Sequence, residues 1–214
     1  MRSGIFYSLQ LLMLSALMSV VHAQTQQQLQ FDVYLNDKKI GYHRVDIENL
    51  DSGKIVKTEA NFKVKFLFFD AYKYQHSAQE KWSVTGCLKT IESKTNDDGE
   101  EQFVSGRKDD QQFKITDQDS TERVDGCVRS FAYWDLDLIK SSRLLNSQNG
   151  SYLDVTTDFV GAESIVVNGK TINADHYRIN SEEMIINVWY SNSKEWVALS
   201  TVVNGGNELR YERK

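Results

Sequence analysis

The sequence contains no proline in its 214 residues, whereas average usage of about 5% would give roughly ten. This absence excludes collagen-like repeats, proline-rich ligand motifs and cis-prolyl turns. Because proline lacks the N–H group that pairs neighbouring strands, a chain without it is compatible with long, regular sheets. The turns must then be made by glycine, asparagine, aspartate and serine.

The sequence also lacks the residue spacings of known catalytic and metal sites. Three histidines follow residue 23, at His43, His76 and His176, and no His-x-His or His-Glu-x-x-His motif occurs, so we predict no metal site. No Gly-x-Ser-x-Gly sequence is present to hold a serine nucleophile. The acidic residues of 97–101 lack the spacing of a calcium loop and are typical of an exposed turn. We therefore expect no cofactor and favour a non-enzymatic protein.

Positive charge is in deficit, with 25 lysines and arginines against 30 aspartates and glutamates and a formal net charge of −5. A nucleic-acid-binding domain needs a basic face. Attachment to anionic lipid by charge also needs basic segments. The composition therefore argues against a nucleic-acid partner and against electrostatic binding to a membrane surface.

Residues 1–23 have the pattern of a secretory signal peptide. Arg2 supplies the positive charge, an apolar stretch runs over 5–21, and Val21-His22-Ala23 offers a cleavage site. The alternative is a transmembrane anchor, which needs about 20 apolar residues, and here the polar run 24–28 follows a shorter stretch. We expect cleavage after Ala23, no stable membrane anchor, and one domain over 24–214 that is periplasmic or secreted.

The chain has two cysteines, Cys87 and Cys127, and both lie in the part that we expect to be exported. An even pair in an oxidising compartment is typical of a disulfide. Closing the loop between them would stabilise the fold by about 4 kcal/mol in the chain-entropy model. A free buried pair and two metal ligands are the alternatives, although neither cysteine has a neighbour at zinc-site spacing.

The segments 55–68 and 72–82 each place apolar and aromatic residues on one face and polar residues on the other. This alternation fits a strand, because a helix would distribute the same residues around its circumference. The second segment also places a histidine and a glutamate in line with its aromatic residues. The residues of the two faces are Phe62, Val64, Phe66, Phe68, Tyr72, Tyr74, His76, Glu80 and Trp82.

About twelve or thirteen strands are predicted after residue 28, among them 152–159 and 163–167, with one helical segment at 136–145. Turn signals such as 96–99 and 168–169 separate them, and the connections are too short for parallel crossovers. We predict an all-β domain, built as a strongly curved antiparallel sheet or incomplete β-barrel. The helical segment would then form a lid or plug over its open side.

A concave apolar surface with a few polar groups is what a small-ligand cavity requires. Our hypothesis is that the two aromatic faces, together with Phe131, Tyr133 and Trp134, line a cavity for a lipid-like or hydrophobic ligand. The alternative is ordinary core packing. The segment 131–134 is either a fixed plug or a lid that moves to admit cargo.

Several segments carry a resemblance to a known family, namely 31–35, 40–44, 130–134, 144–148, 188–191 and 196–199. The chain resembles an uncharacterised family of exported proteins from Gram-negative bacteria. Its fold is similar to the lipoprotein-carrier (LolA/LolB-like) half-barrel, a curved sheet with a helical lid over an apolar cavity. The resemblance implies a periplasmic location and no established activity.

Three hypotheses of function follow. The first is a periplasmic, non-enzymatic binding or carrier protein for a lipid-like or hydrophobic ligand. The second is an interaction or structural protein of the cell envelope whose cavity is filled by its own side chains. The third is a hydrolase with a catalytic site that the sequence does not reveal.

Overall fold

The computed structural model describes residues 25–66 and 69–214. The predicted signal peptide, residues 1–23, and Phe68 lie outside these ranges, and the side chain of Phe66 is likewise not described. No helix in the described ranges is long and apolar enough to cross a membrane.

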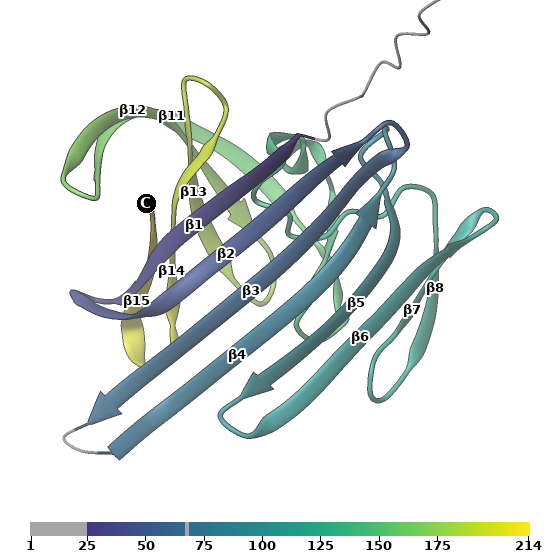
Figure 1. Cartoon of the computed structure of the whole chain (residues 1–214), viewed down its shortest axis with the longest axis horizontal. Helices are drawn as coiled ribbons and strands as arrows, with labels where there is room; N and C mark the ends of the chain where they lie inside the picture. Colours follow the sequence, from purple (N-terminus) through teal and green to yellow (C-terminus); the bar gives the residue numbers. More distant parts are fainter. Residues whose placement is uncertain (1–24, 67–68) are drawn as a thin grey trace, which may run out of the picture.

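The chain forms two runs of antiparallel strands with an irregular segment between them (Figure 1). The first run is β1 (Gln26–Leu35), β2 (Lys38–Leu50), β3 (Gly53–Phe66), β4 (Phe69–Trp82), β5 (Leu88–Asp97), β6 (Glu100–Asp109), β7 (Gln112–Thr116) and β8 (Thr121–Asp125). The second run is β11 (Thr156–Val167), β12 (Lys170–Asn180), β13 (Ile185–Ser191), β14 (Trp196–Val203) and β15 (Asn207–Arg213).

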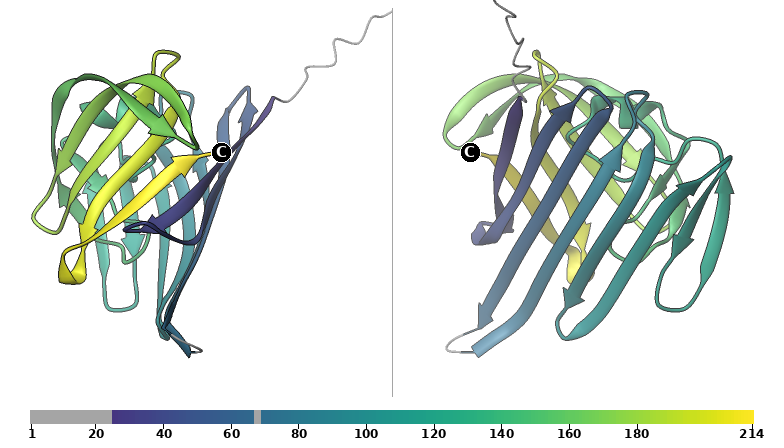
Figure 2. Two further views of the ribbon diagram at one scale, coloured as in Figure 1. Left: turned by 90° about the vertical axis from the view of Figure 1, so that its left-hand side faces the viewer. Right: turned by 45° about the vertical axis from the view of Figure 1, so that its right-hand side comes forward.

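The two runs join into one 13-stranded sheet through the strands nearest the chain ends. β15 pairs antiparallel with β1, and Val33 lies opposite Tyr211. The strand order is β11-β12-β13-β14-β15-β1-β2-β3-β4-β5-β6-β7-β8, which leaves β8 and β11 as unpaired edges. The sheet curves strongly, so that β11–β15 face β1–β5 across the interior (Figure 2). The predicted all-β fold with a curved, unclosed antiparallel sheet is confirmed.

The alternation predicted for β4 is present in the structure. His76, Glu80 and Trp82 are buried on the inner face, together with Tyr74 and Ala78, while the intervening polar side chains are exposed. The cause is the two-residue period of a strand, which sends successive side chains to opposite faces. The apolar residues of this face therefore point into the concave side of the sheet.

The segment between β8 and β11 lies inside the curve of the sheet and acts as a plug. We call residues 128–155 the plug segment. It contains the 3₁₀ turn η1 (Leu136–Lys140) and the short paired strands β9 (Arg143–Leu145) and β10 (Tyr152–Asp154). Leu138, Leu144 and Leu145 are buried in the main core cluster with residues of the large sheet.

The predicted helix over 136–145 is therefore wrong beyond its first turn. Asp135 caps η1 by accepting a hydrogen bond from the backbone N–H of Asp137, and the chain returns to an extended conformation at Ser141. Leu144 and Leu145 are adjacent and both fully buried. Both leucines lie in β9, which pairs with β10, and the N–H of Leu145 donates to the carbonyl oxygen of Arg129.

The predicted break between strands 152–159 and 163–167 is also wrong in position. The chain breaks at Val155, between β10 and β11, and β11 then continues through residues 160–162. The pairing with β12 shifts by one residue between Phe159 and Gly161. Gly161 has φ +153°, a backbone conformation that favours glycine. A β-bulge therefore replaces the turn.

Cys87 and Cys127 form a disulfide with a Cα–Cα distance of 5.2 Å, which confirms the predicted pairing. Cys87 lies in the loop between β4 and β5, and Cys127 follows β8 immediately before the plug segment. The bond therefore fixes the start of the plug segment to the loop between β4 and β5.

Candidate functional site

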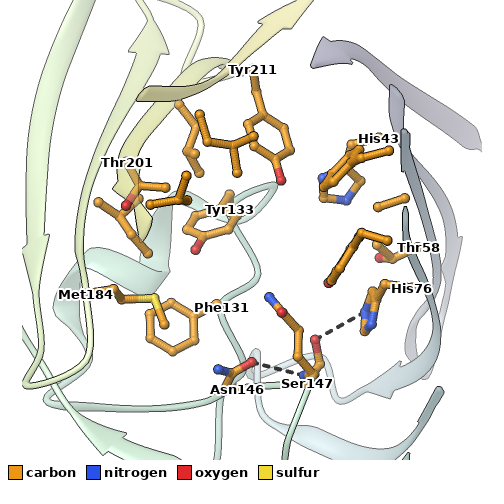
Figure 3. A pocket seen from close by; sticks show the side chains of 18 of the residues that line it. His43, Thr58, His76, Phe131, Tyr133, Asn146, Ser147, Met184, Thr201 and Tyr211 are labelled. Carbon is orange, nitrogen blue, oxygen red and sulfur yellow. Dashed lines mark hydrogen bonds between the residues drawn. The ribbon is translucent and has the colours of Figure 1, made fainter. Parts of the chain in front are cut away.

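The concave side of the sheet holds a cavity of about 1130 Å³. Strands β2, β3 and β4 form one wall and β13, β14 and β15 form the opposite wall, while residues of the plug segment lie between them (Figure 3). Most of the lining side chains are apolar or aromatic, including Phe62, Leu199 and Trp196. The exposed Glu100 and Glu183 are also part of the lining, which is therefore open to solvent on one side.

Most of the site residues that the sequence predicted are brought together here. The residues that line the cavity are Phe62, Val64, Tyr72, Tyr74, His76, Glu80, Phe131, Tyr133 and Trp134. Trp82 lies elsewhere: it is 2% exposed and packs edge-on against Trp134, with ring centroids 5.3 Å apart. Whether these residues bind a ligand stays a prediction.

A row of side chains crosses five neighbouring strands on the cavity wall. The strand register places Phe31, His43, Ala60, His76 and Thr95 opposite one another in turn. His43, Ala60 and His76 all line the cavity. Because the alanine methyl is much shorter than an imidazole, this row has a notch at Ala60 with a histidine on each side.

His43 has a ring surrounded by aromatic side chains and no polar partner. Its centroid is 5.7 Å from that of Trp196 and 5.5 Å from that of Tyr211. Neither ring nitrogen has a hydrogen-bond partner within the described part of the chain. Burial lowers the pKa of His43 to about 3, and the nearby His76 adds to the effect. The ring is therefore neutral at pH 7.

His76 is held by hydroxyl groups from two elements. Its Nδ1 atom is 2.9 Å from Oγ1 of Thr95, and that hydroxyl donates onward to the carbonyl oxygen of Gln148. Nδ1 is therefore the protonated nitrogen, and Nε2, 3.5 Å from Oγ of Ser147, is the acceptor (Figure 3). Burial lowers the pKa of His76 to about 4.

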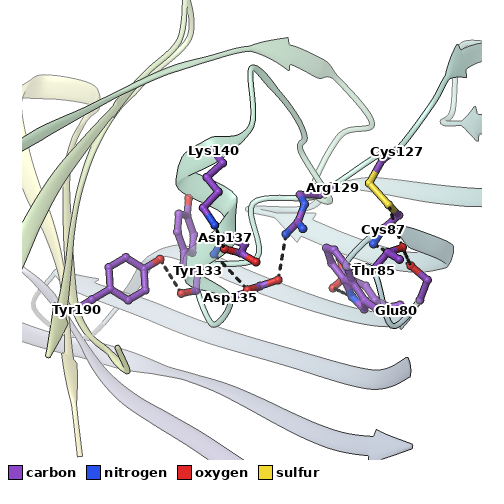
Figure 4. A network of polar contacts seen from close by, with 12 residues as sticks. Glu80, Thr85, Cys87, Cys127, Arg129, Tyr133, Asp135, Asp137, Lys140 and Tyr190 are labelled. Carbon is purple, nitrogen blue, oxygen red and sulfur yellow. Dashed lines mark hydrogen bonds and ion pairs between the residues drawn. A yellow bond between two sulfur atoms is a disulfide. The ribbon is translucent and has the colours of Figure 1, made fainter. Parts of the chain in front are cut away.

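A polar network fixes the plug segment against the cavity floor. The buried carboxylate of Glu80 accepts hydrogen bonds from Ser130 (2.7 Å) and Trp82 (3.0 Å). Burial raises the pKa of Glu80, and these two hydrogen bonds oppose that shift. The hydroxyl of Tyr190 donates to the carbonyl oxygen of Tyr133 (Figure 4). These contacts connect the plug segment to both walls.

Residues 31–214 match the family described as a domain of unknown function, DUF6134. The protein belongs to the DUF6134 family. Its membership of a family without an assigned function is thereby confirmed, whereas export and the lipoprotein-carrier resemblance remain predictions. No curated protein matches the DUF6134 chain in sequence.

The DUF6134 fold is similar to a crystal structure of a beta-barrel-like protein, from the domain of unknown function DUF1849, of Brucella abortus. The TM-score is 0.63 and the sequence identity 10%, and the match covers 89% of this chain and 96% of that chain. At this identity the likeness shows the fold alone.

The arrangement around His76 resembles a nucleophile–base pair only in part. Ser147 is at the outer limit of hydrogen-bond distance from Nε2, and a hydroxyl instead of a carboxylate orients the ring. An imidazole with a pKa of about 4 is also a weak base at neutral pH. Among the described residues of the DUF6134 protein, no group of three or more histidine, cysteine, aspartate or glutamate side chains could hold a metal ion.

Several residues of the site were not predicted from the sequence. They are His43, Asn146, Ser147, Met184, Trp196, Leu199, Thr201 and Tyr211. Asn146, Ser147 and Met184 lie outside the strands, and the first five residues of β14 are all buried, so neither group shows an alternating pattern. The pairing of β15 with β1 brings this group next to β2–β4, and no local pattern in the DUF6134 sequence indicates that pairing.

Proposed function

We propose that this protein binds a lipid-like or otherwise hydrophobic ligand in the cavity, as a non-enzymatic binding or carrier protein of the periplasm. The observation that carries the proposal is the cavity of about 1130 Å³ with a mainly apolar lining. Small-molecule sites usually occupy about 300–1,000 Å³ and have apolar walls with a few polar groups. The volume therefore suits a ligand at or above the upper end of that range.

The arrangement of the two core clusters supports a binding cavity and argues against a fully packed interior. The main core cluster unites the plug segment with β5–β8 and parts of β1–β4 and β12–β14. A smaller cluster, which includes Val33, Phe62 and Tyr74, borders the cavity. The plug segment therefore fills one part of the concave side and leaves the other part open. The periplasmic location rests on the signal-peptide pattern of residues 1–23, and the carrier role on the resemblance to lipoprotein carriers.

A structural role in the envelope is the second candidate, and the plug segment favours it. Leu144 and Leu145 have no exposed surface, so this element behaves as core instead of as a detached lid. A self-filled interior would explain the buried plug segment. It would not explain the large apolar cavity beside it.

Native mass spectrometry of protein purified from the periplasm without detergent tests the proposal. We expect a reproducible mass increase from a bound hydrophobic molecule, identified after extraction into organic solvent. A clean apoprotein mass under several growth conditions would contradict the carrier role and favour the structural one. Recovery of the protein in the cytoplasmic fraction would contradict the location separately.

A matched pair of variants shows whether the ligand occupies this cavity. Thr58 lines the cavity, whereas its neighbour Lys57 lies on the exposed face of the same strand. Thr58→Trp adds a large ring inside the cavity, and we expect it to abolish ligand retention. Lys57→Trp adds the same ring outside and should retain the ligand. Equal retention by both variants, with unchanged thermal unfolding, would place the ligand elsewhere.

A further inference from the structure

The cavity wall carries hydrogen-bonding groups that the protein itself does not use. Both ring nitrogens of His43 lack a partner. The hydroxyl groups of Tyr211 and Tyr133 face the same space, and neither forms a hydrogen bond with the described residues (Figure 3). Buried polar groups in folded proteins are nearly always hydrogen-bonded. The two tyrosine hydroxyls are therefore available to a molecule inside the cavity, whereas the nitrogens of His43 are enclosed by the neighbouring rings of Trp196 and Tyr211.

These groups are all uncharged at neutral pH. Burial lowers the pKa of His43 to about 3 and raises the pKa values of Tyr211 and Tyr133. No lysine or arginine occurs among the described residues that line the cavity. The charged side chains on its lining are acidic, and the exposed Glu100 and Glu183 are among them. The wall therefore offers donors and acceptors without a positive charge.

An anionic head group is disfavoured by this wall. A carboxylate or phosphate that leaves water without a cationic partner loses several kcal/mol of hydration. A cationic head group finds no free acid at the histidine row either, because Glu80 is already bound by Ser130 and Trp82. A hydroxyl or carbonyl oxygen loses less on burial and can be satisfied by one or two neutral partners.

We infer that the ligand is an electrically neutral amphiphile whose hydroxyl or carbonyl oxygen hydrogen-bonds with Tyr211 and Tyr133. The hydroxyl of Tyr211 donates to the ligand oxygen, and the hydroxyl of Tyr133 accepts from a ligand hydroxyl or donates to a carbonyl. The apolar chain lies along Phe62 and Leu199, which line the same cavity. This inference rests on the proposed binding function and specifies its ligand class.

Displacement of a fluorescent apolar probe, N-phenyl-1-naphthylamine, from the purified full-length protein tests the inference. The competitors are 1-dodecanol, dodecanoate and dodecylammonium at pH 8, which share one chain and differ in the head group. We expect dodecanol to displace the probe at a concentration at least tenfold lower than either ion. Equal or tighter binding of an ion would overturn the inference and leave the binding function intact. If the probe itself does not bind, the binding function fails.

Two variants locate the head group. Tyr211→Phe removes one hydroxyl and keeps the ring, so we expect dodecanol binding, compared with the probe's own affinity for the same variant, to weaken about 5- to 10-fold. The control is Tyr34→Phe, because Tyr34 does not line the cavity and stacks under Arg210. An unchanged dodecanol affinity in Tyr211→Phe would overturn the assignment of this residue.

A variant with an added cation gives an independent readout. Thr58 is two residues from Ala60 on the cavity wall, so Thr58→Lys places a positive charge near the histidine row. We expect the preference to reverse, with dodecanoate displacing the probe better than dodecanol. A preference for dodecanol that survives in a folded Thr58→Lys protein would show that the head group lies elsewhere, which contradicts the inference.

Discussion

His43 and His76 are neutral residues inside the sheet, and this determines how pH acts on stability. Each takes up a proton near pH 6.5 when the chain is unfolded, but only near pH 3 and pH 4, respectively, when it is folded. Between these values the unfolded state binds more protons, so the free energy of unfolding falls as the pH falls. The slope is up to about 1.4 kcal/mol per pH unit for each histidine.

Replacing His43 with phenylalanine isolates its part of this slope. The new ring can pack against Trp196 and Tyr211 and cannot be protonated. We expect urea unfolding between pH 7 and pH 4 to show a smaller loss of stability in His43→Phe than in the wild type. Glu80 has a raised pKa and acts in the opposite direction, so the comparison must be between variants. Equal slopes would show that the pKa of His43 is the same in the folded and the unfolded protein.

At the scale of elements, strands with a strict alternation could be predicted from the sequence, and irregular elements could not. β4 follows the predicted pattern because one face is buried over most of its length. β8 was not predicted from the sequence, because Val124 is its only buried residue and a single apolar position gives no alternating pattern. Such low burial is common at a sheet edge. Residues 136–145 of the plug segment were predicted as a helix because their apolar residues have no period of two, and their burial depends on the surrounding sheet.

For the candidate site, the residues on regular neighbouring strands could be predicted from the sequence, and the residues brought in from distant segments could not. The aromatic face of β3 and β4 was visible because all its residues lie in two adjacent strands. His43 was considered only for a metal site or a catalytic triad, and neither was predicted, because its aromatic neighbours come from residues 196 and 211. Those contacts require β15 to pair with β1, and a strand pairing between the two ends of a chain leaves no local pattern in the sequence.

The plug segment gives a prediction at this scale. Leu144 is fully buried in the main core cluster, whereas Leu153 in β10 is only partly buried and lies outside that cluster. Leu144→Ala should lower the free energy of unfolding by about 2–5 kcal/mol, because it leaves a cavity in a packed core. Leu153→Ala should cost much less. Urea unfolding measures both, and a cost under about 1 kcal/mol for Leu144→Ala would indicate a lid that is not part of the core.

At the scale of the whole molecule, the cavity is a consequence of the number of strands. A sheet of about eight strands, when closed, leaves an interior that its own side chains can fill, and wider sheets enclose more space. Here 13 strands curve around one interior. The plug segment fills one part of that space, and the cavity is the part that remains. Binding and stability are therefore divided between two regions of one concave surface.

The disulfide lies in the region that provides stability. Cys87 and Cys127 are 40 residues apart in sequence, and the loop that they close contains β5–β8. In the chain-entropy model a loop of this length stabilises the folded state by about 4 kcal/mol. The double variant Cys87→Ser, Cys127→Ser should lose stability of that order. It should also lose amide protection first in β5–β8, where the edge strand β8 has a neighbour on one side only.

Hydrogen–deuterium exchange with peptide-level mass spectrometry measures which strands lose amide protection in the double variant. We expect exchange in residues 88–125 to accelerate in the double variant, while the strands β1–β3 and β13–β15 retain most of their protection. The probe affinity of the cavity should change little, because its two walls come from β2–β4 and β13–β15. A uniform loss of protection over the chain, with loss of probe binding, would show instead that the sheet unfolds as one unit and that the disulfide stabilises both regions equally.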